Sequence, residues 1–160
     1  MITQEYIKQL FTYADGNLYW KVANSNRVKI GQMAGTLLYQ NYIQIRISRK
    51  KYQAHRLIFL MHYGYLPVQI DHKNNNKADN RIENLRAATN CKNQYNVKII
   101  KTNTSGCKNV TWSKKRKKWY VQLSIDNKRK YFGSFENLEL AELVAIEARN
   151  KYHGDFARHK

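Results

Sequence analysis

The chain has 160 residues, and its hydrophobic content of 42% is sufficient for packed cores in one or two small domains, which excludes wholesale disorder. No stretch approaches the roughly 20 continuous apolar residues of a membrane helix, and the N-terminal sequence lacks the apolar core of a signal peptide, so we expect an intracellular protein without a membrane partner. Twenty-nine Lys and Arg residues outnumber 11 Asp and Glu residues, and the net charge of +18 indicates a polyanionic partner, of which nucleic acid is the first candidate.

The positive charge is spread along the chain. Residues 1–70 carry 9 basic and 2 acidic residues, residues 71–103 carry 7 and 3, and residues 104–160 carry 13 and 6. This spread predicts several surfaces that face one long anionic partner, because a single basic arm would concentrate the excess. The two cysteines, Cys91 and Cys107, form no CxxC pair, so we expect neither a disulfide framework nor a zinc ribbon.

The first part of the chain begins with a short helical pattern over residues 2–11 and continues with strand signals punctuated by glycines. In the strand pattern, Ile43, Ile45 and Ile47 alternate with polar residues, so the isoleucines are expected on the buried face. Arg46 would then lie on the outer face. We interpret it either as a phosphate contact or as a solvated side chain.

Residues 54–64, with the sequence AHRLIFLMHYG, form an apolar run that is followed by Pro67. The run is too short to span a membrane, and it predicts a buried helix that ends at Gly64. A short strand is expected next, ending at Asp71 and His72. Because consecutive strand residues point to opposite faces, the strand must bend or end there if both side chains address one phosphate.

The segment after this strand is rich in asparagine, which disfavours regular structure. Residues 74–76 predict a turn, and Asn84 lies near an expected helix start. We expect a helix that runs through Ala87 and Ala88 and carries Asn93.

The last part of the chain predicts three strands and one helix. Residues 118–125 alternate apolar and polar side chains, turn residues precede the strand-like residues 128–132, and residues 110–112 supply a third strand. Apolar residues then recur every three or four positions, which indicates an amphipathic helix with Asn137 as N-cap and Gly154 as its end. A three-stranded sheet packed on one helix is a complete small domain.

Three side chains of the central segment offer the groups needed for metal-assisted phosphodiester cleavage. Asp71 supplies a carboxylate and Asn93 an amide carbonyl, and these oxygen ligands suit Mg²⁺ or Mn²⁺ better than Zn²⁺. His72 can take a proton from water at neutral pH. Each residue also has an alternative interpretation when taken singly: Asp71 as a turn former, His72 as a partly buried histidine and Asn93 as a solvated helix residue.

The spacing of these residues closely resembles the HNH nuclease signature in its His-Asn-Asn variant: an Asp-His pair, an Asn 12 residues after the His, and an Asn nine further on. The resemblance implies a ββα-metal finger in which Asp71 and Asn93 bind the divalent ion and His72 activates water. Asn84 would brace the loop that holds His72, and His55 would be structural. The cysteine pairs that bind zinc in some HNH proteins are absent, so no structural zinc is implied.

Residues 105–157 resemble the APETALA or ethylene-response-factor type of DNA-binding domain, although Asn109 and Ser124 depart from its usual residues. The family lays its sheet in the major groove of double-stranded DNA, and the basic loop before the second strand reaches phosphates. Trp112 and Trp119 are expected in the core. The DNA contacts implied here are Thr111, Ser113, Lys114, Lys115, Arg116, Lys117, Lys118, Tyr120, Gln122, Ser124, Arg129 and Tyr131.

The fold class expected is therefore α+β, with four parts along the chain. The first part is also similar to the N-terminal segment of many phage HNH enzymes. The expected parts are an N-terminal β-rich unit over residues 1–53, the HNH finger over 54–100, a linker over 101–106 and the DNA-binding domain over 107–160.

The leading hypothesis is a site-directed, divalent-metal-dependent DNA endonuclease of the homing type, acting as a monomer or weak dimer in a bacterial or phage-infected cytoplasm. No protein partner is implied. The alternative, from a different class of function, is a DNA-binding regulator or accessory factor with a silent HNH finger. The net charge and the sheet modules are expected to be the same for a nuclease and for a regulator, so they do not distinguish the two functions. A third hypothesis is an enzyme that acts on RNA.

Overall fold

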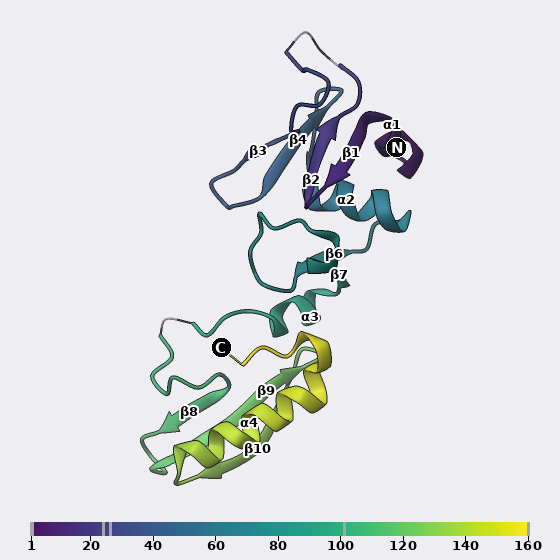
Figure 1. Cartoon of the computed structure of the whole chain (residues 1–160). Helices are drawn as coiled ribbons and strands as arrows, with labels where there is room; N and C mark the ends of the chain where they lie inside the picture. Colours follow the sequence, from purple (N-terminus) through teal and green to yellow (C-terminus); the bar gives the residue numbers. More distant parts are fainter. Residues whose placement is uncertain (1, 24, 26, 101, 160) are drawn as a thin grey trace. The chain divides into compact units, whose positions relative to one another are not determined.

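The computed structural model describes residues 2–23, 25, 27–100 and 102–159, so Lys101, the first residue of the expected linker, lies outside the described residues. The chain divides into two compact units, Met1–Thr89 and Asn90–Lys160 (Figure 1). Each unit combines helices with small antiparallel sheets, which confirms the predicted α+β class. None of the described helices is both long enough and apolar enough to cross a bilayer.

The described residues of the first unit form two helices, a short 3-10 turn and three small antiparallel sheets. The sheets have the strand orders β1-β2, β3-β4-β5 and β6-β7. Its elements are α1 (Gln4–Leu10), β1 (Phe11–Ala14), β2 (Asn17–Trp20), β3 (Thr36–Leu37), β4 (Ile43–Ile47), β5 (Lys50–Gln53), α2 (Ala54–Tyr63), β6 (Gln69–His72), η1 (Ile82–Asn84) and β7 (Leu85–Ala88).

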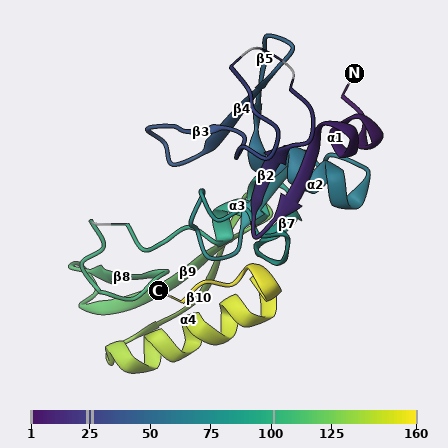
Figure 2. The same ribbon diagram turned by 45° about the horizontal axis from the view of Figure 1, so that its top comes forward.

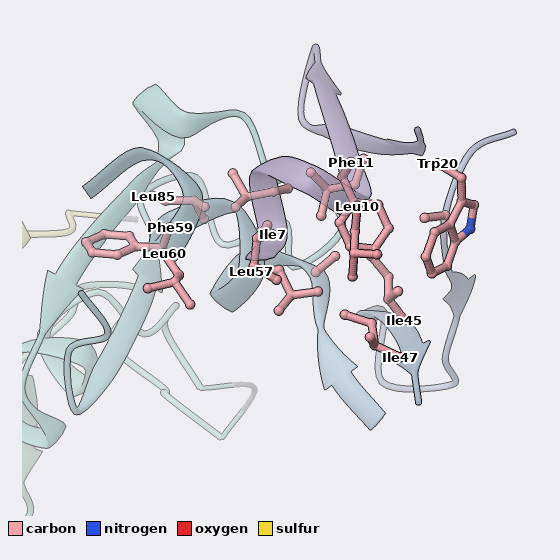
Figure 3. Close-up of a cluster of buried hydrophobic side chains, with 14 of the residues drawn as sticks. Ile7, Leu10, Phe11, Trp20, Ile45, Ile47, Leu57, Phe59, Leu60 and Leu85 are labelled. Atoms are coloured by element: carbon pink, nitrogen blue, oxygen red, sulfur yellow. The ribbon is translucent and has the colours of Figure 1, made fainter. Parts of the chain in front are cut away.

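One apolar core holds the first unit together (Figure 3). The side chain of Thr3 caps α1, which buries Ile7 and Leu10 against the rest of the core. Helix α2 is buried along most of its length and ends at Gly64 in the left-handed region, as the sequence predicts. The core also includes Leu85 of β7, so the segment that carries Asp71 and His72 is tied to both helices.

The strand predicted around Ile43, Ile45 and Ile47 is confirmed as β4. Ile45 and Ile47 are buried and Arg46 is exposed, which is the expected alternation. Lys51 of β5 is the direct cross-strand partner of Arg46.

The prediction of a helix through Ala87 and Ala88 is wrong. Leu85–Ala88 forms β7, which pairs antiparallel with β6, and the helix begins only at Asn90. Alanine favours helices in isolation, but Leu85 and Ala88 are buried in this strand, and their packing overrides the local preference.

The second unit begins with α3 (Asn90–Tyr95) and contains a sheet of order β10-β9-β8 covered by one helix, as predicted (Figure 2). The remaining elements are β8 (Val110–Ser113), β9 (Lys118–Ile125), β10 (Lys128–Phe135), α4 (Leu138–His153) and η2 (Gly154–Phe156). The Asn137 side chain caps α4, and the helix ends at Gly154, both as expected.

The core of the second unit lies between α4 and the inner face of the sheet. Val121 and Leu123 are fully buried there against Ala141 and Ala145 of the helix. Trp119 packs against this core, as expected, whereas Trp112 is 37% exposed, which corrects its expected place in the core. Trp112 lies on β8, an edge strand of the sheet, and contacts the Trp119 ring at a centroid distance of 4.8 Å.

Candidate functional site

Asp71 and His72 are the last two residues of β6, and both are buried, at 4% and 5% exposure. The ladder with β7 is regular here, with Asp71 opposite Arg86 and His72 opposite Leu85. The strand ends at His72, as expected, and a turn follows in which the backbone N–H of Asn75 donates to the His72 carbonyl over 2.8 Å. Strand positions that follow one another direct their side chains to opposite faces, so the regular ladder separates the two side chains up to the end of β6.

Arg86 neutralises the buried Asp71 carboxylate. Its Nε and a terminal guanidinium nitrogen lie 2.7 Å and 2.6 Å from Asp71 Oδ2. Both contacts are made with the same carboxylate oxygen. A carboxylate removed from water requires such a charged partner. Sequence reasoning missed Arg86, because it assigned this segment to a helix and not to the strand opposite β6.

The imidazole of His72 is held by Asn80. Its Nε2 lies 3.1 Å from Asn80 Oδ1, and both residues are buried. Burial lowers the pKa of His72 from its ordinary value, although the Asn80 hydrogen bond and the negative charge of Asp71 oppose this effect. The ring is therefore neutral at pH 7, which is the form that accepts a proton.

Two further rings pack beside His72. The His55 ring lies edge-on at a centroid distance of 5.1 Å, and the Tyr42 ring lies at 6.2 Å. Burial, with a smaller effect of His72, lowers the pKa of His55 to about 3. His55 Nδ1 is buried without a hydrogen-bond partner among the described residues. This side chain is thus an uncharged part of the packing.

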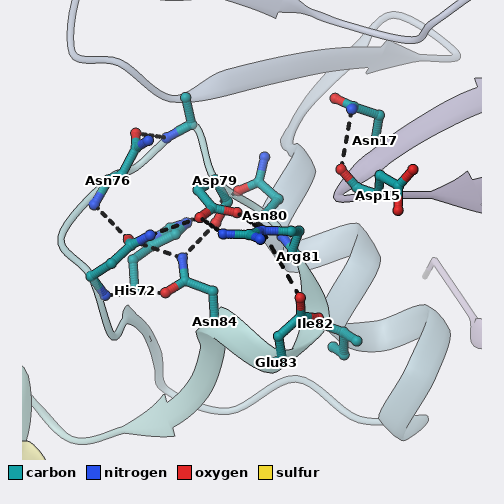
Figure 4. A network of polar contacts seen from close by, with 12 residues as sticks. Asp15, Asn17, His72, Asn76, Asp79, Asn80, Arg81, Ile82, Glu83 and Asn84 are labelled. Atoms are coloured by element: carbon teal, nitrogen blue, oxygen red, sulfur yellow. Dashed lines mark hydrogen bonds and ion pairs between the residues drawn. The ribbon is translucent and has the colours of Figure 1, made fainter.

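Asn84 connects the two ends of the loop between β6 and β7 (Figure 4). The amide of Asn84 donates to Asn74 Oδ1 over 3.1 Å and to the backbone carbonyl of Asp79 over 2.7 Å. Its Oδ1 accepts from the backbone N–H of Asn74. Asn84 makes these contacts with the loop and has none with the His72 ring among the hydrogen bonds described.

Asp79 and Arg81 form a second bridge in the same loop, with nitrogen to oxygen distances of 2.7 Å and 2.9 Å. The hydrogen bonds from Arg81 lower the pKa of the Asp79 carboxyl far below its usual range. Asn74 also donates to Asp79 over 2.7 Å. Sequence reasoning treated this asparagine-rich stretch only as a turn. Its repeated Asn and Asp residues were the available signal, because such side chains hydrogen-bond nearby backbone groups.

The β1-β2 hairpin supports the loop from the other side. The Tyr13 hydroxyl accepts from the backbone N–H of Ile82 over 3.0 Å. At the hairpin turn, Gly16 has a φ of +82°, and a Cβ atom there would stand 2.7 Å from the backbone nitrogen of Arg81. Only glycine therefore allows this close approach.

Asn93, the expected second metal ligand, lies on α3 in the second unit. Its grouping with Asp71 and His72 rests on the sequence spacing alone. Across the described part of the chain, no group of three or more His, Cys, Asp or Glu side chains could hold a metal ion. A donor set of one carboxylate and one amide carbonyl still fits a hard ion such as Mg²⁺, which retains several waters.

The polar DNA-contact candidates of the second unit share one face of the sheet. Cross-strand partners lie on the same face. The pairs are Thr111 with Tyr120, Ser113 with Lys118, Gln122 with Tyr131, and Ser124 with Arg129. A cavity of about 410 Å³ on this sheet is lined by Thr111, Trp112, Ser113, Tyr120, Gln122 and Arg129.

The basic candidates differ in their surroundings. Lys114–Lys117 forms the exposed turn between β8 and β9. Lys118 pairs with Glu136 over 3.3 Å. In the first unit, Arg46 lines a cavity of about 380 Å³ together with Arg27 and Lys51.

Comparison with known proteins places the chain in a family. The model of the HNH endonuclease family matches residues 52–95, the segment that contains Asp71, His72, Asn84 and Asn93. Protein 3.8 of Escherichia phage T7 is 37% identical over 89 residues, which are 56% of this chain and 73% of the phage protein. No solved structure matches significantly. The chain therefore belongs to the same family as Protein 3.8 of phage T7, and it carries an HNH endonuclease domain at residues 52–95.

Proposed function

We propose that this protein is a site-directed, divalent-metal-dependent endonuclease of the homing type that hydrolyses phosphodiester bonds of double-stranded DNA. One observation carries the proposal: within the HNH region, the buried carboxylate of Asp71 and the buried imidazole of His72 occupy the last two positions of β6. A net charge of +18 suits a polyanionic substrate.

In this proposal, His72 takes a proton from the attacking water. Asp71 and Asn93 would hold Mg²⁺ or Mn²⁺, and the bound ion would neutralise charge on the scissile phosphate and the leaving oxygen. Asn84 keeps the loop that supports His72 in place through its hydrogen bonds to Asn74 and Asp79. No structural zinc is part of this proposal.

The regular ladder through Asp71 and His72 weighs against a shared role, since it directs the two side chains apart. The end of the strand directly after His72 weighs in favour, because the next residues already form a turn.

Recognition of the DNA site is assigned to the outer face of the β8-β9-β10 sheet, in the manner of an APETALA-type domain. Gln122 can read adenine through a bidentate contact. The basic turn before β9 contacts phosphates, which positions the protein on the DNA without reading its sequence. The exposed Trp112 lines the cavity on this sheet and offers an apolar contact surface. Arg46, with Arg27 and Lys51 beside it, supplies a phosphate contact from the first unit.

The test is cleavage of candidate duplex DNA with Mg²⁺ or Mn²⁺ by the native chain and by His72→Ala. Loss of a general base is expected to lower the cleavage rate by roughly 10²- to 10⁴-fold. His62→Ala serves as the matched control, since His62 is exposed on α2 and has no role in the proposed chemistry. Asp71→Ala and Asn93→Ala are expected to weaken the dependence on metal concentration. Equal cleavage by the native chain and His72→Ala would eliminate the proposed base.

A specific contact favours a second candidate function. Arg86 already neutralises Asp71, and a guanidinium competes with a cation for the same carboxylate. The protein would then be a DNA-binding regulator or accessory factor with a silent finger. Intact DNA after prolonged incubation with both metals, despite salt-sensitive binding, would support this function over the nuclease.

A further inference from the structure

Helix α4 has an acidic and apolar outer face in a chain that is otherwise strongly basic. Residues 136–147 hold four of the 11 Asp and Glu residues and no Lys or Arg. The inner side of the helix buries Ala141 and Ala145 against the sheet. On the outer side, Leu140 and Leu143 are 49% and 60% exposed. Three exposed carboxylates lie three or four positions from one of these leucines: Glu136, Glu139 and Glu147.

The outer face of α4 suits neither DNA nor the same face of another copy. Its carboxylates repel phosphates. Two such helices that met leucine to leucine would also bring their like charges together, which disfavours that contact. The partner of this face must therefore offer an apolar surface that is surrounded by positive charge.

The cavity of about 380 Å³ in the first unit has these properties. Its lining includes Met33 and Leu38, which are 51% and 36% exposed. It also includes the cations Arg27, Arg46 and Lys51, and no Asp or Glu is among its described lining residues. Arg46 and Lys51 are direct cross-strand partners, a position in which like charges repel. No ion pair within the described part of the chain supplies these cations with a carboxylate.

We infer that the outer face of α4 docks in this cavity of a second copy of the chain. Leu140 and Leu143 would then pack on the apolar lining, and the carboxylates around them would lie near the three cations. Because the two surfaces differ, the contact is heterologous, and copies associate as a reciprocal dimer or as longer rows. The net charge of +18 opposes association, but the Debye length of about 8 Å at physiological salt leaves the decision to the local charges.

The inference does not rest on the proposed function, because this contact needs neither metal nor DNA. It affects one part of that function, the phosphate contact assigned to Arg46 with Arg27 and Lys51 beside it. The carboxylates of α4 would occupy the same cations. Self-association and this phosphate contact therefore exclude each other.

Sedimentation velocity of the full chain tests the inference, at about 0.1 M NaCl and at protein concentrations from roughly 5 to 500 µM. We expect the sedimentation coefficient to rise with concentration. The rise should be smaller at about 1 M NaCl, where the Debye length is roughly 3 Å. Two double variants are each expected to remain monomeric. The helix variant is Leu140→Gln with Leu143→Gln, and the cavity variant is Arg46→Glu with Lys51→Glu.

A mixture of the two variants gives the sharpest result. The helix variant keeps its cavity and the cavity variant keeps its α4 face, so an equimolar mixture restores one contact. It should form a species of twice the monomer mass and none larger. Lys114→Glu with Lys115→Glu is the matched control, because it changes the charge equally in an exposed turn and should associate like the native chain.

Three results would each overturn the inference: a native chain that is monomeric at every concentration, a helix or cavity variant that associates like the native chain, or a mixture of folded variants that stays monomeric. Circular dichroism establishes that each variant is folded. Glu139→Lys with Glu147→Lys replaces the helix variant if the glutamine substitutions prevent folding, since it removes the charge complementarity of the same face.

Discussion

The buried His55 should make the first unit sensitive to mild acid. In the unfolded chain a histidine has a pKa near 6.5, whereas burial lowers the folded pKa of His55 to about 3. Below pH 6.5 the unfolded state therefore binds a proton that the folded state does not accept. The stability contributed by the neutral ring is present above pH 6.5 and is lost as the pH falls toward 3.

The size of the effect follows from these two pKa values. Each pH unit between them costs about 1.4 kcal/mol, so the free energy of unfolding should fall by about 2 kcal/mol between pH 7.5 and pH 5 through His55 alone. This figure hardly depends on the folded pKa as long as it lies well below 5. It is therefore a sharper prediction than the total loss at lower pH.

The comparison is between the native chain and His55→Gln, which has a similar volume but does not titrate. Amide hydrogen exchange in α2, which is buried in the core of the first unit, reports the unfolding free energy of that unit. The variant is expected to be less stable at pH 7.5 because it alters the packing, but to lose about 2 kcal/mol less than the native chain on going to pH 5. Equal losses in the two proteins would show that His55 is not held neutral.

Two further predictions concern the hairpin turn and the basic loop. Gly16→Ala should destabilise the first unit by more than Gly31→Ala. Both glycines have a φ near +80°, a conformation that costs about 1 kcal/mol or more for alanine. Only at Gly16 would the added Cβ also strike the backbone of Arg81. Urea unfolding checks this, and equal losses would contradict the close packing at the turn. Replacing Lys115 and Lys117 together by Gln should reduce the slope of log K against log salt for DNA binding by about 2, since each lysine in a phosphate contact contributes roughly 0.9. An unchanged slope would remove this loop from the DNA interface.

Much of the fold could be predicted because its patterns are local. The alternation in β4 and β9, the period of α4 and its cap at Asn137 are set by neighbouring residues, and the structure confirms them. The strand β7 could not be predicted from propensity, because its alanine-containing sequence is stabilised by pairing with β6 and by burial of Leu85.

The candidate site shows the same division. The spacing of Asp71, His72 and Asn84 was visible in the sequence. The partners Arg86 and Asn80 were not, since each is selected by three-dimensional contact: a cross-strand pair in one case and a loop that folds back onto the ring in the other. Asn80 stands among several similar asparagines, and only the folded loop distinguishes it from its neighbours.

The support that the N-terminal hairpin gives to the loop has a practical consequence for attempts to make a minimal nuclease. A fragment limited to the HNH match at residues 52–95 would lack Tyr13, Gly16 and the α1 side of the apolar core. It would expose the inner surface of α2 to water and leave the backbone at Ile82 without its phenol partner. Truncation from the N-terminal side should therefore stop before α1 if the fragment is to keep its loop ordered.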